Sequence, residues 1–486
     1  MRFAGVRSDR EGVMTTSERM GAISGADWAR RIVAMPYSRR AIGRSCCALL
    51  LVGAFVGATL ALARPVAAVT MIDCNTPNDF CTGDPCMTTD ELQITVASCV
   101  LDFGTRALVL NQVVFVPNGG SLTLSAGSIE VRRRIDGRHI KASGGDGADV
   151  SLTALGNITV RKRVDAAGRS TTGNIVLSAG GNIDLRDQLR ARAKGRGATA
   201  NGGNITVTAL GTIASTHKGK IDVHGRINHS SGGHATISGN NGINLEGKID
   251  ARGNPAGAVS VASLAGNIVL AEEVRADGSP GAGGNVAIDA NGMVTAMDRL
   301  NASGGTPGGG TISVDGGGTV TLTDLRSDGK LGAPAGSVGA TAGNLVVGGV
   351  RVRGGGAGGV VNLFSKLGDV NVDRIDARGR DAAGGLVTVS SAADLLNSTH
   401  TKIGGDDHGG QAHFTALGNM TLGQFKGSRL EATGAVGGVL EGHAGGNLTA
   451  MGTFEAATGG CIGLSAGGML NTSGVDADVP ITPSCP

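Results

Sequence analysis

The sequence predicts an all-β solenoid, and three observations lead to this prediction. A phrase of alternating apolar residues that begins with glycine recurs between about residues 121 and 460, most clearly at Gly173, Gly203, Gly284 and Gly310. Its copies are about 26 residues apart, which lies within the range of solenoid repeats. The apolar residues alternate with a period of two, and no 3.6-residue apolar period runs through the array. We therefore expect short strands that coil and stack turn on turn.

Each repeat unit is expected to make three short strands around a common core. In the unit that begins at Gly284, we expect Val286 and Ile288 to point inward from the first strand. Val294 should fill the second wall and Leu300 the third. The polar residues of this unit are expected outside or at corners, and they are Asn285, Asp289, Thr295 and Arg299.

Residues 1–68 have the character of a leader. Three arginines precede an uncharged run over residues 46–63, and the small residues Val66, Ala67 and Ala68 follow it. This pattern predicts a signal peptide cut after Ala68, and an uncleaved membrane anchor is the alternative. The leader holds 10 Arg and 4 acidic residues, so its removal changes the net charge from +3 to −3. We expect an exported protein with no transmembrane segment after cleavage, in the periplasm, at the cell surface or outside the cell.

The remaining cysteines occupy the two ends of the chain and predict disulfides. Cys74, Cys81, Cys86 and Cys99 follow the leader, Cys461 and Cys485 lie near the far end, and none lies in the repeat array. An even number of cysteines in an exported chain favours disulfides, and Cys461–Cys485 is the expected pair. The first four cysteines allow three disulfide connectivities that the sequence does not distinguish, and zinc binding is the alternative to disulfides for this group. We expect an N-terminal cap over 69–120, the array over 121–460 and a C-terminal cap over 461–486.

Two recurring polar residues are expected to serve the turns. Asparagine follows glycine at one place in many units, and aspartate recurs in phrases such as IDARG. Both residue types suit corners, so we prefer this interpretation to a polar binding stripe or a column of calcium ligands. No metal or cofactor is expected. The residues concerned are Asn157, Asn174, Asn182, Asn204, Asn267, Asn285, Asn344, Asn419, Asn447, Asp165, Asp250, Asp277, Asp328 and Asp376.

Phrases such as GNITVTALGTI and GNIVLAEEVRADG resemble those of exported bacterial right-handed parallel β-helix proteins, especially the filamentous-haemagglutinin-like group. The resemblance covers about residues 100–470. It implies a right-handed parallel β-helix, here of about 13–14 coils, and an adhesin-like surface protein. The chain departs from that group in two ways: it shows no clear two-partner secretion signature, and its last residues, VPITPSCP, do not resemble a membrane barrel.

A basic column is the predicted binding site. Alignment of residues 129–136 with 158–165 and 183–186 places Arg132, Arg161 and Arg186 one strand spacing apart. Stacked like charges favour an anionic partner such as an acidic polysaccharide, a lipopolysaccharide phosphate or another cell-envelope component, and extracellular DNA also has the required charge. The alternative is a solvated face neutralised by Glu130, Asp136, Asp165 and Asp187. Nucleic acid is not the expected ligand, because residues 69–486 contain no Tyr or Trp to stack on bases. The flanking residues are Arg133, Lys162, Arg134 and Arg163, and the extension comprises Arg138, Lys141, Arg190, Arg192, Lys194 and Arg196.

The sequence gives no catalytic constellation. His400, Asp406, Asp407, His408 and His413 lack a metal-ligand spacing and are expected to be a polar loop. A polysaccharide lyase or hydrolase is the main alternative function, but the uniform units and scarce aromatic residues argue against it. A purely structural spacer is the third possibility. We expect a non-catalytic surface or matrix protein, and the oligomeric state stays open.

Overall fold

The computed structural model describes residues 69–137, 145–194, 200–226, 229–330, 332–424 and 427–485. The leader predicted for residues 1–68 lies outside these ranges. The described residues form strands and turns, with one short 3-10 helix, η1 (Pro77–Asp79). Within this part of the chain, no helix is long and apolar enough to span a membrane.

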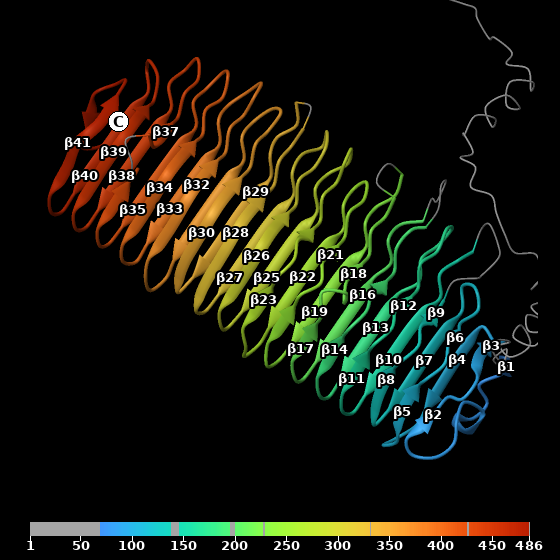
Figure 1. Cartoon of the computed structure of the whole chain (residues 1–486). Helices are drawn as coiled ribbons and strands as arrows, with labels where there is room; N and C mark the ends of the chain where they lie inside the picture. Colours follow the sequence, from blue (N-terminus) through green and yellow to red (C-terminus); the bar gives the residue numbers. More distant parts are fainter. Residues whose placement is uncertain are drawn as a thin grey trace, which may run out of the picture. The chain divides into compact units, whose positions relative to one another are not determined.

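The chain from residue 69 onward winds into a parallel β-solenoid of about 16 turns (Figure 1). Most turns give one strand to a 16-stranded sheet, here called sheet 1, and the rest of the turn to a 26-stranded sheet, sheet 2. Successive turns pair in parallel and in register, as Ile175 with Ile205 and Leu177 with Val207 show. With a strand spacing of about 4.8 Å, the stack is about 70 Å long.

Sheet 1 holds the first strand of each repeat unit. Its members are β4 (Ser98–Asp102), β7 (Ser121–Ala126), β10 (Asp149–Ala154), β13 (Ile175–Ala179), β16 (Ile205–Ala209), β19 (His234–Gly239), β22 (Ala258–Ser263), β25 (Asn285–Ala290), β27 (Thr311–Gly316), β29 (Ser337–Ala342), β31 (Val360–Ser365), β33 (Leu386–Ser391), β35 (Gln411–Ala416), β38 (Val439–Ala444), β40 (Cys461–Ala466) and β42 (Ile481–Thr482).

Sheet 2 holds the second and third strands, which are separate in the N-terminal turns and merge into one longer strand in most later turns. The second strands are β2 (Cys86–Met87), β5 (Ala107–Leu110), β8 (Ser128–Val131), β11 (Ile158–Val160), β14 (Ile183–Leu185), β17 (Ile213–Ser215), β20 (Ile243–Leu245), β23 (Ile268–Leu270) and β36 (Met420–Leu422). The third strands are β1 (Val69–Ile72), β3 (Glu91–Ile94), β6 (Val114–Phe115), β9 (Ile135–Asp136), β12 (Val164–Asp165), β15 (Leu189–Arg190), β18 (Ile221–Asp222), β21 (Ile249–Asp250), β24 (Val274–Arg275) and β37 (Arg429–Glu431). The merged strands are β26 (Val294–Asn301), β28 (Thr319–Arg326), β30 (Asn344–Arg351), β32 (Val370–Asp376), β34 (Leu395–Lys402), β39 (Leu448–Glu455) and β41 (Leu470–Ala477).

The alternation of apolar residues places the core as predicted. Val286, Ile288, Val294 and Leu300 are at most 2% exposed, whereas Asn285 lies on the outside. The same pattern in the other turns builds one continuous hydrophobic core along the solenoid. Because the side-chain period of a strand is two, one face of every strand is committed to this core and the other to the surface.

The turns outnumber the 13–14 that we predicted, because the cysteine-bearing segments expected only as caps also supply strands. β4 pairs with β7 at the N-terminal end, and β40 pairs with β38 at the other. Disulfides join Cys461 to Cys485, as predicted, and settle the open connectivity as Cys74–Cys99 and Cys81–Cys86. The cysteines therefore fasten the first and last turns of the same ladder.

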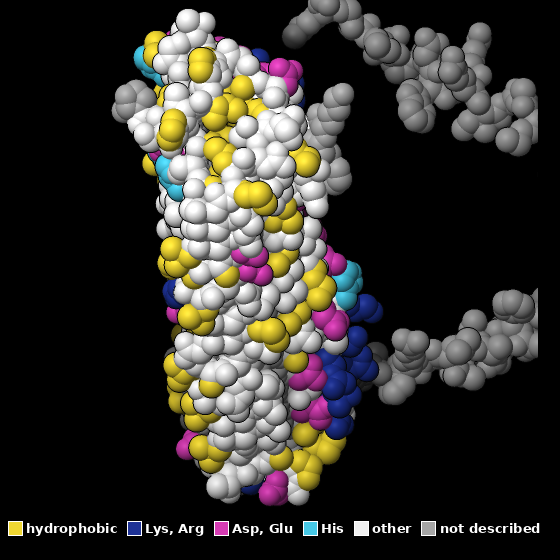
Figure 2. Space-filling model, turned by 90° about the vertical axis from the view of Figure 1, so that its left-hand side faces the viewer, with side chains coloured by type: hydrophobic (Ala, Val, Ile, Leu, Met, Phe, Trp, Pro, Cys, Tyr) yellow, Lys and Arg dark blue, Asp and Glu magenta, His cyan; other side chains and the backbone are white. Residues whose placement is uncertain are grey.

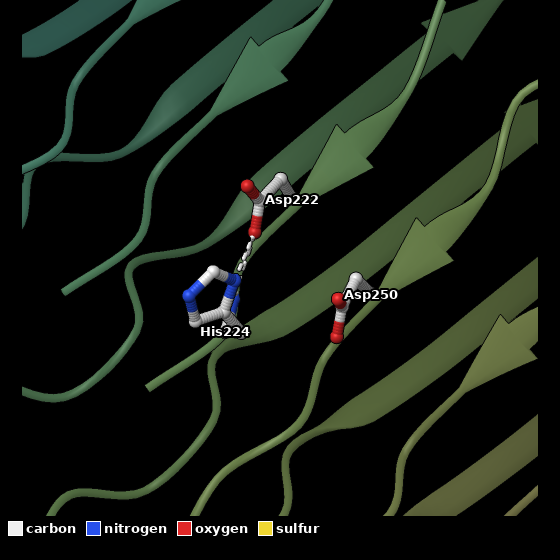
Figure 3. Close-up of side chains that lie close together, drawn as sticks. All are labelled: Asp222, His224 and Asp250. Carbon is white, nitrogen blue, oxygen red and sulfur yellow. Dashed lines mark hydrogen bonds and ion pairs between the residues drawn. The ribbon is translucent and has the colours of Figure 1, made fainter. Parts of the chain in front are cut away.

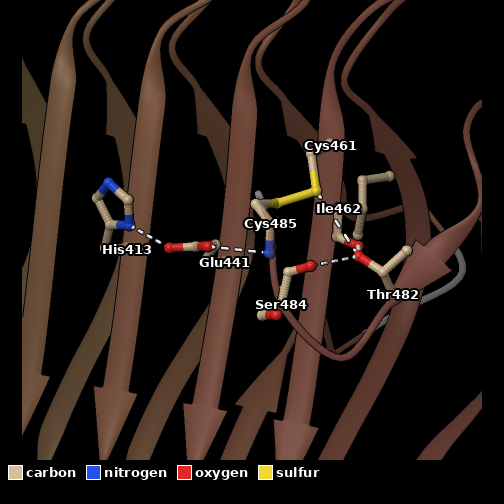
Figure 4. The surroundings of a disulfide bond; sticks show 7 residues. All are labelled: His413, Glu441, Cys461, Ile462, Thr482, Ser484 and Cys485. Atoms are coloured by element: carbon tan, nitrogen blue, oxygen red, sulfur yellow. Dashed lines mark hydrogen bonds and ion pairs between the residues drawn. A yellow bond between two sulfur atoms is a disulfide. The ribbon is translucent and has the colours of Figure 1, made fainter.

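The last residues fold back onto sheet 1 and are held there by polar contacts (Figure 4). β42 lies beside β40, and the Thr482 hydroxyl donates to the carbonyl of Ser484 at 2.8 Å. The amide of Cys485 donates to Glu441 Oε1 at 3.2 Å, and Glu441 Oε2 lies 2.7 Å from Nδ1 of His413. The disulfide to Cys461 completes this attachment.

Candidate functional site

The recurring asparagines make corner hydrogen bonds between turns, which confirms their predicted structural role. Asn157 Oδ1 accepts a hydrogen bond from the amide of Asn182 at 2.8 Å, and Asn182 Oδ1 accepts one from the amide of Thr212 at 2.8 Å. The same contact recurs near the C-terminal end, where Asn419 accepts from the amide of Asn447 at 3.0 Å. The carboxamide oxygens are thus engaged along the solenoid, so this column is not a free polar binding stripe.

The predicted basic column lies where sheet 2 turns a corner. The register matches Val131 with Val160 and Val160 with Leu185, so the arginines that follow these residues stack on successive turns. The backbone amides of Arg161 and Arg186 donate to the carbonyls of Val131 and Val160, each at 2.8 Å. The alignment of Arg132, Arg161 and Arg186 thus predicted their placement correctly, and their role in ligand binding stays a prediction. We call these three residues the basic ladder.

Acidic neighbours partly neutralise the basic ladder. Glu130 forms ion pairs with Arg132, at 2.9 Å, and with Arg161. Burial raises the pKa of Glu130, but the hydrogen bonds and charges of these two arginines outweigh burial and hold the pKa below its ordinary value. Arg186 pairs with Asp184 at 2.7 Å. The positive charge of the basic ladder is therefore partly neutralised within the protein, as the alternative of a solvated face requires.

The flanking column carries the uncompensated charge. Arg133 and Lys162 follow the ladder residues on adjacent turns, are exposed, and have no side-chain partner among the described residues. Arg134 and Arg163 instead lie 3.3 Å from Asp136 and 3.2 Å from Asp165, respectively. Of the predicted extension, Arg190, Arg192 and Lys194 are described, and Arg138, Lys141 and Arg196 lie outside the described residues.

Basic groups predominate in these N-terminal turns. The described residues between 128 and 194 include 11 Lys and Arg against 7 Asp and Glu. Figure 2 shows a largely uncharged face on which Lys and Arg gather along one edge, with Asp and Glu among them. An anion that approaches this edge therefore meets an excess of positive charge.

A longer array of charged residues runs along the third strands. Its members directly follow the buried inward-facing residue of each third strand, and the register aligns them turn by turn, with Asn301 as the uncharged member. We call this array the charged ladder. The charged face is the surface around it, and it includes the basic ladder, Arg133 and Lys162 at the N-terminal turns. The ladder comprises Asp136, Asp165, Arg190, Asp222, Asp250, Arg275, Asn301, Arg326, Arg351, Asp376, Lys402, Glu431 and Glu455.

The charged ladder corrects one prediction. Asp165, Asp250 and Asp376 lie within β12, β21 and β32, so the prediction that they are turn residues is wrong. Asp165 and Asp376 are 1% and 5% exposed, and a buried carboxylate is costly without a positive partner. Asp376 meets that need through Arg353 and through Arg378, whose Nε lies 3.0 Å from Asp376 Oδ1.

Asp222, His224 and Asp250 converge on this face, and they are the group of potential metal ligands that comes together within the described residues (Figure 3). Nδ1 of His224 lies 2.5 Å from Asp222 Oδ1. Asp250 forms a two-pronged pair with Arg252, at 2.8 and 2.7 Å. Burial raises the pKa of Asp250, but Arg252 outweighs it and lowers the pKa. Arg192 also lies 3.4 Å from Asp222, so guanidinium groups already supply the cationic charge here.

The second predicted cluster does not converge. His400 lies in β34 of sheet 2, whereas His413 lies in β35 of sheet 1 and contacts Glu441. Asp406, Asp407 and His408 lie between these strands in the connecting loop. The expectation of a polar loop is therefore correct for Asp406, Asp407 and His408 and wrong for His400 and His413, which lie in strands.

Sequence reasoning missed two adjoining pockets on the charged face. They have volumes of about 210 and 230 Å³ and share Arg353, Arg374 and Asp376. The carboxylates of Asp324 and Asp376, which line the first pocket, each accept from two arginines. Carboxylates that accept hydrogen bonds from two arginines fix the position of those guanidinium groups. Alignment of VRVRG with IDARG and with TKIGG would have revealed the concentration of basic residues here.

No known protein family, curated protein or solved structure matches this chain. The resemblance to the filamentous-haemagglutinin-like group therefore stays an expectation drawn from the repeat phrases.

Proposed function

We propose that this protein is an exported, adhesin-like, non-catalytic solenoid that binds an anionic polymer along its charged face. The carrying observation is the pair Arg133 and Lys162, which are exposed, stacked on adjacent turns and without side-chain partners among the described residues. Like charges one strand spacing apart repel each other, and an anion between them relieves that repulsion. A polymer fits better than a small ion, because basic residues gather on successive turns at two separate places along the solenoid.

Export and surface location are part of this proposal. Three disulfides fasten the two ends of the solenoid, and such bonds persist in oxidising compartments. A rigid stack of about 70 Å presents equivalent positions at each turn, so several weak contacts can act together on one ligand. Acidic polysaccharides and cell-envelope polymers have the required repeated charge.

The carbohydrate-active enzyme alternative receives less support from the site. Acid–base hydrolysis of a glycoside needs a protonated carboxyl group near a second carboxylate. Burial raises the pKa of Asp376, but the hydrogen bonds and charges of Arg378 and Arg353 outweigh burial and lower it. Asp324 is likewise engaged by Arg299 at 2.9 Å and Arg326 at 2.8 Å. Asp376 is therefore poorly suited to donate a proton near neutral pH.

The test measures binding of the purified protein to a sulfated polysaccharide and to a polyuronate at physiological salt. The Arg133→Gln/Lys162→Gln double variant removes the unpaired charges and leaves the Glu130 pairs intact. We expect its affinity to fall about tenfold, which corresponds to about 1.4 kcal/mol. The Arg132→Gln/Arg161→Gln/Arg186→Gln triple variant should also bind more weakly.

Lys366→Gln is the matched control. Lys366 is an exposed cation near the outer face of sheet 1, 3.1 Å from Asp315, so its loss changes net charge without touching the charged face. We expect the control to bind within twofold of the parent protein. Full affinity in both the double and the triple variant would overturn the proposal, as would turnover of either polymer by the parent protein.

A further inference from the structure

The two pockets on the charged face lie about eight turns from the centre of the basic ladder and form a second basic centre. They lie over the ends of β28, β30, β32 and β34, which are consecutive strands of sheet 2. Six Lys and Arg line them, against two Asp and one His. The charged lining residues are Asp324, Arg326, Arg351, Arg353, Arg374, Asp376, Arg378, His400 and Lys402.

A buried glycine lies beneath Arg374, one of the residues that line the first pocket. The register aligns Asp324, Gly349, Arg374 and His400 on successive turns, and Gly349 is the member without a side chain. A Cβ at position 349 would lie 3.6 Å from Nη2 of Arg374 and 4.0 Å from Asp324 Oδ1, which are ordinary contact distances. A small side chain is therefore tolerated at Gly349, and a longer one would press against the guanidinium of Arg374, which lies over this buried glycine.

Arg374 takes part in none of the ion pairs around the pocket. Asp324 is paired with Arg299 and Arg326, and Asp376 is paired with Arg353 and Arg378. The exposed side chain of Arg374 has no ion-pair or hydrogen-bond partner among the described residues. A guanidinium group presents several N–H donors in a planar fork, and oxyanions are its preferred partners.

The second pocket holds a further unsatisfied group. Nδ1 of His400 is buried and has no hydrogen-bond partner in the described structure. Buried polar atoms are rarely left without one, and the same imidazole lines the second pocket. Lys402 lies on the same turn and also lines this pocket, and its amine lies 3.3 Å from the carboxylate of Glu431.

We propose that these pockets bind one oxyanion substituent of the polymer, a sulfate ester, phosphate or carboxylate, with Arg374 as the principal donor. The inference rests on the proposed function, since the substituent is carried by the anionic polymer. The pocket volumes of about 210 and 230 Å³ lie below the roughly 300–1,000 Å³ of sites that enclose a whole small molecule. They suit a charged group that projects from a chain lying along the charged face.

The test compares four variants in binding to a sulfated oligosaccharide, a polyphosphate and an oligouronate. Arg374→Gln removes the unpaired cation, and Gly349→Gln displaces the guanidinium of Arg374 while every charge is retained. Gly349→Ala adds only a methyl group at an ordinary contact distance from Arg374, and Lys366→Gln removes one cation at a site away from the pockets. Thermal unfolding and circular dichroism establish whether each variant is folded. If Gly349→Gln does not fold, Arg374→Gln alone tests the proposal.

We expect Arg374→Gln and Gly349→Gln to weaken binding of at least one polymer about tenfold. Gly349→Ala and Lys366→Gln should stay within twofold. The polymer that responds identifies the substituent. Equal losses in Arg374→Gln and Lys366→Gln, or full affinity of folded Gly349→Gln and Arg374→Gln, would overturn the inference. If Arg133→Gln/Lys162→Gln weakens binding and the pocket variants do not, the pocket inference fails and the proposed function stands.

Discussion

Removal of the Cys461–Cys485 disulfide should release the C-terminal tail and leave the central turns folded. The bond closes a loop with a sequence separation of 24, for which the loop-entropy relation gives about 3.5 kcal/mol. Other contacts of the tail that follows β41 are few, because β42 pairs with β40 through only two residues. In a solenoid each turn contacts mainly its neighbours, so most of this loss should stay local.

Hydrogen–deuterium exchange of the Cys461→Ser/Cys485→Ser variant measures this effect directly. We expect the opening free energy of β42 and its contacts with β40 to fall by up to about 3.5 kcal/mol, limited by the stability that this region has. Amides of β16, far from the tail, should exchange at the parent rate. Unchanged exchange in β42 would refute the argument that the disulfide holds the tail, and faster exchange throughout the solenoid would refute the argument that the effect is local.

Three further changes test the core, the corners and the charged ladder. Phe414→Ala should lower the free energy of unfolding by about 3–5 kcal/mol in chemical denaturation, because Phe414 is 1% exposed and pairs with the small Gly442 on the next turn. Asn182→Ala should cost about 1 kcal/mol in the same assay, since the amide of Thr212 loses its acceptor at an exposed corner. The lowered pKa of Asp376 means that its ionised form stabilises the fold above the ordinary carboxyl pKa of about 3.9, and that this stabilisation is lost as pH falls through the folded-state value. Urea midpoints between pH 2 and 6 should therefore fall less steeply in Asp376→Asn than in the parent protein.

Local pattern was enough to predict the architecture. The period-two alternation assigned Val286 and Ile288 to the core, and the recurrence of Gly-Asn phrases placed asparagines at corners. Both follow from short-range rules that repeat in every turn. The number of turns was underestimated because the end segments lack those phrases, although their strands pair in the same ladders.

The details of the charged face depend on contacts between turns, which a single repeat unit does not reveal. Alignment stacked Arg132 on Arg161 correctly, but it could not show that Glu130 lies between them and leaves Arg133 as the unpaired charge. The placement of Arg374 depends on Gly349 of the preceding turn, against which its guanidinium lies. In a glycine-rich chain, one more glycine has no distinguishing pattern.

The most direct test of polymer binding along the charged face is a lysine acetylation footprint of the parent protein with and without the sulfated polysaccharide. Lys162 and Lys366 are both exposed, so each reports on its own part of one molecule. We predict that the polymer slows acetylation of Lys162 severalfold and leaves that of Lys366 unchanged. Equal protection of both lysines, or protection of Lys366 alone, would contradict the account.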